Sequence, residues 1–202
     1  MTKTDLIRNN IEQNNGYLFM SKIEDFGISR TYILRYVKDN ELERVAKGIY
    51  ITGETWPDIL YIYCIRNPQI IYSGETALYL HSLIDREYSD ICVSVPSGYN
   101  GSRLREKGVI VHQERDGIYG LGMTDCETQF GNTVRLYDRE RCICDLIKNR
   151  DSYDIQMFQT ALKEYMRRKD RDLNKLIKYA VFFILYLMIR EPGLIVVTYS
   201  GR

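Results

Sequence analysis

The sequence predicts a mixed α+β protein: a small N-terminal unit of helices and a hairpin, a larger α/β unit, and a helical C-terminus. Three observations predict this class. Short helical patterns alternate with two-residue strand periodicity over residues 4–51. Residues 59–137 alternate helical stretches with β-branched strands such as Ile91–Val95. From Ile155 onward helical periodicity dominates, and 202 residues suffice for one large or two small domains.

The chain is expected to open with a helix, an extended piece and a second helix. Thr4 is placed to cap the first helix, which Gly16 ends. Tyr17–Phe19 then reads as a short extended segment. Ser21 is placed to cap a short helix over residues 22–26.

A third helix follows a glycine turn and carries basic residues. Gly27 turns the chain, and Ser29 caps a helix that runs to about Asp39. The apolar positions expected to face inward are Ile33, Leu34 and Val37. The residues left facing outward are Arg30, Thr31, Tyr32, Arg35 and Lys38.

Two alternating segments, residues 41–45 and 48–51, read as strands around the turn Ala46-Lys47-Gly48. Two helices separated by a glycine turn and followed by a basic hairpin indicate a helix-turn-helix with a wing. This arrangement places one helix in the major groove of DNA.

The expected contacts divide by position. Arg30, Thr31 and Tyr32 at the start of the third helix approach base edges, whereas Arg35 and Lys38 lie nearer the phosphates. Arg44 and Lys47 on the wing reach a minor groove or phosphates.

The charge of this region is modest. Residues 29–50 hold five basic and three acidic residues, and the whole chain has a net charge of only +1. Few phosphate contacts give weak binding, so two copies on an inverted repeat or several cooperating copies are expected. The alternative is a winged helix that contacts another protein, with its charges solvated.

The predicted domains are residues 1–52, a linker over 53–58 stiffened by Pro57, and an α/β domain over 59–202. Within the last domain, Asp138 is placed to cap a helix whose arginine and acidic residues form internal ion pairs. Further helices are expected over residues 155–167 and from Leu173 onward.

A second basic surface is conceivable between residues 163 and 178, which hold seven basic and three acidic residues. It would extend a DNA footprint or meet an acidic partner, although a solvated helix face explains the same charges. The residues proposed for it are Arg167, Arg168, Lys169, Arg171 and Lys175.

No catalytic, metal or cofactor site is predicted. The pair Cys142 and Cys144 lacks a second pair, and His81 and His112 stand alone. Gly101-Ser102 is similar to the Gly-Ser of nucleotidyltransferases, but no paired carboxylates follow to hold magnesium. The chain opens on an amphipathic stretch without a signal-peptide pattern, so a cytoplasmic protein with reduced thiols is expected.

Several segments together resemble the AbiEi family, the antitoxins of bacterial abortive-infection toxin–antitoxin modules. The resemblance covers roughly residues 5 to 178, and the order of its motifs is more specific than any one of them. The matching segments are the winged helix ending in Leu42-Glu43-Arg44-Val45-Ala46-Lys47-Gly48-Ile49-Tyr50, Tyr72–His81, Ile91–Tyr99, Arg135–Arg141, Asp145–Arg150 and Ala161–Tyr165.

The resemblance implies an autoregulated phage-defence protein. The winged helix would bind inverted repeats in its own promoter and repress the operon. The C-terminal domain would counteract a nucleotidyltransferase-like toxin without a stable complex. The resemblance implies neither a cofactor nor a membrane partner, and a monomer or weak dimer that cooperates on DNA is expected.

The end of the chain departs from the family. Residues 180–189 are apolar all round and an unfamiliar tail follows, so 179–202 read as an atypical end, either a changed reading frame or a divergent one. Ten apolar residues span about 15 Å as helix, which is too short for a membrane core of roughly 30 Å.

Two other functions remain open. The chain is a plain transcription regulator if its second domain senses a ligand or dimerises. It is an enzyme only if its site has escaped recognition, and the lack of paired carboxylates argues against that.

Overall fold

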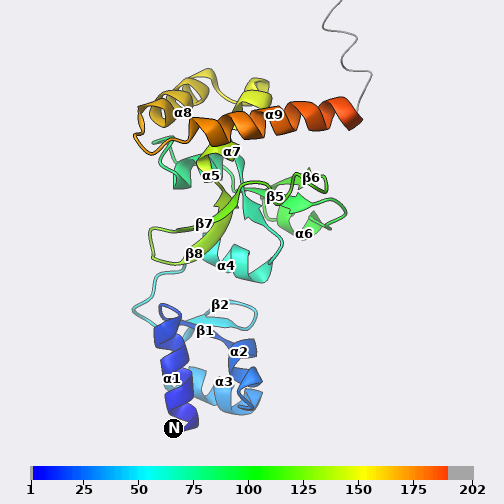
Figure 1. Ribbon diagram of the computed structural model, residues 1–202. Coiled ribbons are helices and arrows are strands. Elements are labelled where there is room, and N and C mark those ends of the chain that lie inside the picture. The colour runs from blue at the N-terminus through cyan, green and yellow to red at the C-terminus, as the bar shows by residue number, and fades with distance from the viewer. Residues whose placement is uncertain (1, 191–202) are drawn as a thin grey trace, which may run out of the picture. The chain divides into compact units, whose positions relative to one another are not determined.

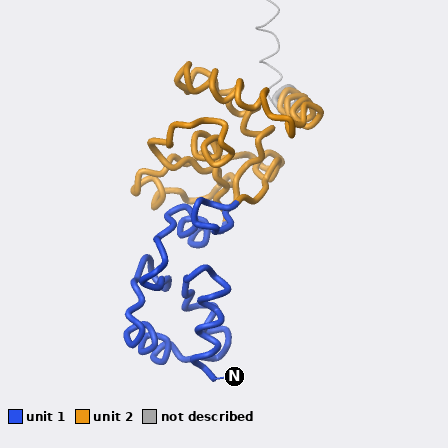
Figure 2. Tube along the Cα trace, turned by 90° about the vertical axis from the view of Figure 1, so that its left-hand side faces the viewer, with its two compact units in different colours: residues 1–68, 127–134 blue, residues 69–126, 135–202 orange. Residues whose placement is uncertain are grey.

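The computed structural model describes residues 2–190, with side chains described through Tyr186, and has the mixed α+β class that the sequence predicts (Figure 1). The chain divides into two compact units (Figure 2). Among the described residues, unit 1 comprises 2–68 and 127–134, and unit 2 comprises 69–126 and 135–190.

Unit 1 is a helix-turn-helix followed by a strand hairpin. Its three strands form one antiparallel sheet in the order β1-β3-β2. Its elements are α1 (Lys3–Gln13), β1 (Tyr17–Phe19), α2 (Met20–Asp25), α3 (Arg30–Asp39), β2 (Glu43–Ala46), β3 (Ile49–Ile51) and α4 (Ile59–Arg66).

The sheet of unit 1 is covered on both faces. Leu18 and Tyr50 join the core that α1, α2 and α3 form, which includes Ile7, Ile23 and Ile33. Alternate residues of a strand point to opposite faces. The opposite face therefore carries a second apolar cluster, whose members are Tyr17, Phe19, Ile49 and Ile51, packed against Tyr61, Ile62 and Ile65 of α4.

This second cluster shifts the domain boundary relative to the sequence prediction, which ends the first domain at residue 52. The helix α4 groups with unit 1 because it covers the outer face of the sheet. Asp58, expected in a linker, is 1% exposed, and its carboxylate accepts a hydrogen bond from the Tyr61 amide at the start of α4.

The start of each helix in unit 1 differs in detail from the sequence prediction. Thr2 caps α1 in place of Thr4: its hydroxyl accepts from the Asp5 amide, and the Asp5 carboxylate accepts from the Thr2 amide. Phe19 precedes α2, so Ser21 lies inside that helix and does not cap it. Ser29 precedes α3 as expected, without a side-chain cap hydrogen bond.

Unit 2 is built on a sheet of five strands in the order β6-β5-β4-β8-β7, whose outer hairpin β7–β8 has its tip in unit 1. β4 pairs antiparallel with β5 and parallel with β8, and β5 pairs parallel with β6. Its elements are β4 (Ile71–Tyr72), α5 (Gly74–Leu80), β5 (Cys92–Pro96), α6 (Ser102–Arg105), β6 (Ile110–Glu114), β7 (Met123–Glu127), β8 (Thr133–Tyr137), α7 (Arg139–Lys148), the short 3-10 helix η1 (Arg150–Ser152), α8 (Ile155–Arg167) and α9 (Leu173–Arg190).

The helices of unit 2 confirm most of the predicted elements. Asp138 caps α7, since its carboxylate accepts from the Arg141 amide 2.8 Å away. The helix α8 has the predicted bounds, and the short helix α6 was not predicted. The sequence prediction missed β7, whose side chains are mostly polar and half or fully exposed.

The last helix, α9, is continuous from Leu173 to Arg190 (Figure 1). The atypical tail beyond Arg190 lies outside the described residues. Over residues 2–190, no helix combines the length and apolar character that crossing a membrane requires.

Candidate nucleic-acid interface

The helix-turn-helix is formed by α2 and α3 around Gly27. Gly27 has a φ of +76°, a left-handed conformation that favours glycine and lets the chain reverse within a few residues. Ile23 of α2 and Ile28 of the turn are buried in the same cluster as Ile33. This shared core fixes α3 against the rest of unit 1 and leaves its other face in solvent.

The buried side of α3 is narrower than the sequence predicts. Ile33 and Val37, one helical turn apart, are 0% and 9% exposed. Leu34 is 42% exposed, so its predicted inward orientation is wrong. One residue advances about 100° around a helix, and this step takes Leu34 away from the stripe that Ile33 and Val37 share.

Four of the five predicted DNA-contacting residues of α3 are exposed, namely Arg30, Thr31, Arg35 and Lys38. Arg30 and Thr31 occupy the first turn of the helix, as readers of base edges do in this motif. Within residues 2–190, neither Arg30 nor Lys38 forms an ion pair. Their charges are therefore available to a polyanion.

Tyr32 occupies a different position from these four. It is half-buried and packs against the core, and its hydroxyl lies 2.9 Å from the Thr4 hydroxyl of α1. The ammonium of Lys3 lies 5.8 Å from the centre of its ring. Tyr32 therefore contacts α1 and helps to hold α3 in place.

Arg35 is the one predicted contact of α3 that has an acidic neighbour in the described range. Its Nε lies 3.5 Å from the Asp39 carboxylate, with side chains 81% and 60% exposed. Exposed pairs of this kind contribute little, about 0–1 kcal/mol. A phosphate could therefore replace Asp39 as the partner of Arg35 at small cost.

An open pocket of about 400 Å³ adjoins this pair. It lies between α1 and α3, and both polar and aromatic side chains line it. The lining residues are Thr4, Tyr32, Arg35, Tyr36, Asp39 and Asn40.

The wing is the β2–β3 hairpin, and its two basic residues are exposed. A bulge interrupts the pairing between Arg44 and Ala46, and Gly48 closes the turn with a φ of +75°. The Arg44 Nε donates a hydrogen bond to the Ala46 carbonyl at 3.3 Å, which holds the side chain beside the turn. Lys47 stands at the tip of this hairpin.

The predicted second basic surface is largely neutralised by its own acidic residues. Arg167 pairs with Glu164 at 2.7 Å, Arg168 with Asp170 at 3.1 Å, and Lys175 with Asp138 at 2.9 Å. The bonds from Arg139 and Arg168 lower the pKa of Asp170 to about 2, so it is charged at neutral pH.

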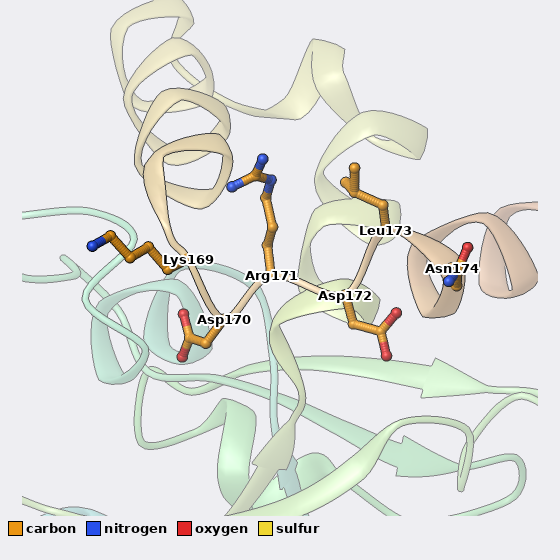
Figure 3. A pocket seen from close by; sticks show the side chains of 6 residues that line it. All are labelled: Lys169, Asp170, Arg171, Asp172, Leu173 and Asn174. Atoms are coloured by element: carbon orange, nitrogen blue, oxygen red, sulfur yellow. The ribbon is translucent and has the colours of Figure 1, made fainter.

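Among the five residues proposed for that surface, only Lys169 and Arg171 remain without an acidic partner in the described part of the chain. Their side chains diverge around an open pocket of about 500 Å³, which Asp170 and Asp172 also line (Figure 3). Arg171 donates a hydrogen bond to the Arg168 carbonyl at 2.6 Å. The loop thus offers two separated cations.

Unit 2 contains a buried arginine, Arg141. The sequence predicted ion pairs within its helix but not its burial. Arg141 is 0% exposed, and its Nε donates to the Asp145 carboxylate at 2.8 Å, the predicted type of internal pair. Its Nη1 donates to the carbonyls of Ile118 and Leu121. The i, i+4 spacing of Arg141 and Asp145 could have signalled the pair, but nothing in the sequence signals its burial.

The buried contacts of Arg141 hold the core of unit 2 together. The Arg141 guanidinium lies between the rings of Tyr137 and Phe183, 4.2 and 4.8 Å from their centres. Burial raises the pKa of the Asp145 carboxyl, and the charge of Arg141 opposes that rise. Together the contacts join α7, α9 and the segment around residue 120 into one core.

Three thiols of unit 2, those of Cys92, Cys142 and Cys144, are held in their protonated form. Burial raises the pKa of both Cys92 and Cys144 to about 11, and that of Cys142 well above its ordinary value. A thiolate is the nucleophile and the metal ligand, so these groups are chemically quiet at neutral pH. No group of three or more histidine, cysteine or acidic side chains in the described part of the chain could hold a metal.

Comparison with known families found a match for the N-terminal segment. Residues 5–52 match the family described as transcriptional regulator, AbiEi antitoxin. The match begins within α1 and ends just after β3, and it confirms the resemblance to this family over that segment. No curated protein matches the chain.

Proposed function

We propose that the chain is an autoregulating antitoxin that binds inverted repeats in its own promoter and represses the operon. The observation that carries the proposal is the exposed face of α3, where Arg30, Thr31 and Lys38 project while Ile33 and Val37 anchor the helix. The family match over the same segment supports it.

The contacts follow from this placement. Arg30 reads a base edge, since its guanidinium suits the two acceptors of guanine. Arg35 and Lys38 lie further along α3 and contact phosphates, with Arg44 and Lys47 of the wing extending the footprint. The few cations of one copy favour binding by two copies on an inverted repeat.

The antitoxic role is assigned to the remainder of the chain. It counteracts a nucleotidyltransferase-like toxin in a phage-defence module, without a stable complex, and it requires no cofactor. Arg30→Ala and Arg44→Ala should then abolish repression and leave protection from the toxin intact. If unit 2 serves only ligand sensing or dimerisation, co-expression with the neighbouring toxin gene gives no protection.

The first test is a salt titration of binding to the DNA upstream of the reading frame. Wild type should bind this DNA saturably and in preference to random DNA, with affinity falling steeply as salt rises. Arg30→Ala should weaken binding at least tenfold and remove the sequence preference.

Arg66→Ala is the matched control for that titration. It removes the same charge from an exposed residue of α4, which packs on the opposite face of the sheet from α3. The control should bind like wild type. If wild type binds random DNA as tightly as the upstream DNA, α3 is instead a helix that contacts another protein.

A further inference from the structure

The open pocket of about 400 Å³ between α1 and α3 is lined by polar groups from both helices. From α3 it takes Tyr32, Arg35, Tyr36 and Asp39, which recur at intervals of three and four residues and so share one side of the helix. From α1 it takes Thr4. The pocket therefore lies within unit 1, between two helices that share one apolar core.

This pocket lies beside the face of α3 that is proposed to enter the major groove. One residue advances about 100° around a helix, so Arg35 falls between the exposed Thr31 and the pocket residue Tyr32. A helix in the major groove has a sugar–phosphate backbone on either side of it. A pocket on this side of α3 therefore meets a strand backbone and not base edges.

The pocket holds hydroxyl donors that the protein leaves available. The Thr4 and Tyr32 hydroxyls lie 2.9 Å apart, and a bond between two hydroxyls uses one proton and leaves the other available. In the described part of the chain the Tyr36 hydroxyl makes no hydrogen bond. Tyrosine and threonine hydroxyls are among the groups that bind DNA phosphates.

The charges around the pocket favour an anion. The Arg35 guanidinium lines the pocket, and only its Nε approaches Asp39, at 3.5 Å in an exposed pair. The Lys3 ammonium lies 5.8 Å from the centre of the Tyr32 ring and forms no ion pair within the described residues. The neighbouring Asp5 carboxylate accepts from the backbone at the start of α1. Two cations thus accompany one lining carboxylate.

We propose that this pocket binds one phosphate of the DNA backbone. The Arg35 guanidinium and the Lys3 ammonium neutralise the phosphate, and the hydroxyls of Tyr32 and Tyr36 donate to its oxygens. The phosphate replaces Asp39 as the partner of Arg35. The site adds α1 to a footprint otherwise made by α3 and the wing, and a backbone contact of this kind fixes the orientation of α3 in the groove.

The inference rests on the proposed function, because it takes its phosphate from the DNA that the chain is proposed to bind. A phosphate group could also come from a free ion. The pocket is open to solvent and adjoins the face of α3 with Thr31 and Lys38, which favours a phosphate that belongs to the DNA strand.

The first test compares the salt dependence of binding to the upstream DNA. Lys3→Ala should weaken binding about three- to tenfold and lower the slope of log K against log salt by about one, since one phosphate contact is lost. Tyr36→Phe removes only a hydroxyl, so it should weaken binding about two- to fivefold and leave the slope unchanged. Both variants should keep the preference for upstream over random DNA, because a phosphate carries no sequence information.

Arg66→Ala and Tyr61→Phe are the matched controls. They remove a cation and a hydroxyl from α4, which packs on the opposite face of the sheet from α3. Like that of Tyr36, the Tyr61 hydroxyl makes no hydrogen bond to any described residue. Both controls should bind DNA like wild type, and circular dichroism checks that all four variants fold.

The second test identifies the phosphate by replacing each one in turn with an uncharged methylphosphonate. At one position in each half-site the replacement should weaken wild type but have little further effect on Lys3→Ala or Tyr36→Phe, because the variants have already lost that contact. Wild type that prefers the upstream DNA but shows no such position would overturn this inference and leave the proposed function standing. Wild type without that preference would overturn both.

A titration with inorganic phosphate separates the two sources of the group. The ring signals of Tyr32 and Tyr36 in the NMR spectrum should respond to upstream DNA, and added phosphate should not shift them in the DNA complex. Inorganic phosphate that occupies the pocket while DNA remains bound would overturn the DNA backbone as its ligand and assign the pocket to a free phosphate.

Discussion

Asn132 donates a hydrogen bond to the Asp58 carboxylate at 2.9 Å, although 74 positions separate them in the chain. The Thr128 hydroxyl donates to the same carboxylate oxygen, and Asn15 donates to Asn132 and to the Gly131 carbonyl. Residues 127–134 are thereby part of unit 1, where they close over the start of α4.

Asp58→Ala should lower the free energy of unfolding by about 2–3 kcal/mol, because it removes the cap of α4 and leaves buried donors on Thr128 and Asn132 unpaired. Urea denaturation checks this value. Asp58→Asn keeps the size and a cap acceptor, so it should cost less. Equal stability of Asp58→Ala and wild type would contradict a structural role for this carboxylate.

Asp39→Asn should strengthen binding to the upstream DNA about two- to fivefold at low salt, because it releases Arg35 and removes a negative charge beside α3. The gain should vanish at high salt, where screening removes it. Glu54→Gln, the same charge change at an exposed position between β3 and α4, should have little effect. Fluorescence anisotropy at two salt concentrations measures both.

Arg141→Ala should destabilise the protein by about 3–5 kcal/mol, because it leaves the Asp145 carboxylate and two backbone carbonyls buried without their donor. Arg139→Ala is the control on the same helix: it breaks an ion pair with Asp170 at 2.6 Å whose partners are 27% and 56% exposed. Its cost should stay below about 1 kcal/mol. Thermal unfolding of the two variants compares them directly.

Cys92 and Cys144 should resist alkylation, because burial raises their pKa from 9.0 to about 11. Two pKa units lower the thiolate fraction at pH 8 about a hundredfold. Iodoacetamide labelling read by mass spectrometry should therefore modify Cys126, which is half-buried, first. Unfolding in guanidinium should make all five thiols react alike.

The raised pKa of these two thiols also makes the free energy of unfolding depend on pH. A thiol whose pKa is raised on folding binds its proton more tightly in the folded state. The contribution of each thiol to the free energy of unfolding is complete below pH 9 and is lost as the pH rises toward 11. Stability that rises over this interval would contradict the burial of these thiols.

Local patterns in the sequence predicted the elements that local chemistry determines. The turn at Gly27, the cap at Asp138 and the bounds of α8 follow from residues within one or two helical turns of each other. The choice of Thr2 over Thr4 as cap also depends on a local partner, Asp5, that the prediction overlooked. The two helices around Gly27 and the hairpin that follows them therefore lie where the sequence predicts them.

Long-range packing accounts for what the sequence did not predict. Tyr32 and Leu34 both lie on α3, and only the position of α1 decides that the aromatic residue packs inward while the leucine faces solvent. The charges of residues 167–175 likewise predicted a basic surface, whereas acidic partners as distant as Asp138 neutralise much of it. Such partners become visible only once the chain is folded.

Because α4 covers the outer face of the β1-β3-β2 sheet, unit 1 is difficult to produce as a fragment or to transfer to another protein. A piece ending at residue 52 would expose the rings of Tyr17 and Phe19 and would tend to aggregate. A piece ending at residue 68 would still lack the segment that satisfies Asp58. Unit 1 is thus discontinuous in the gene, and no single recombination point can transplant it whole onto another protein.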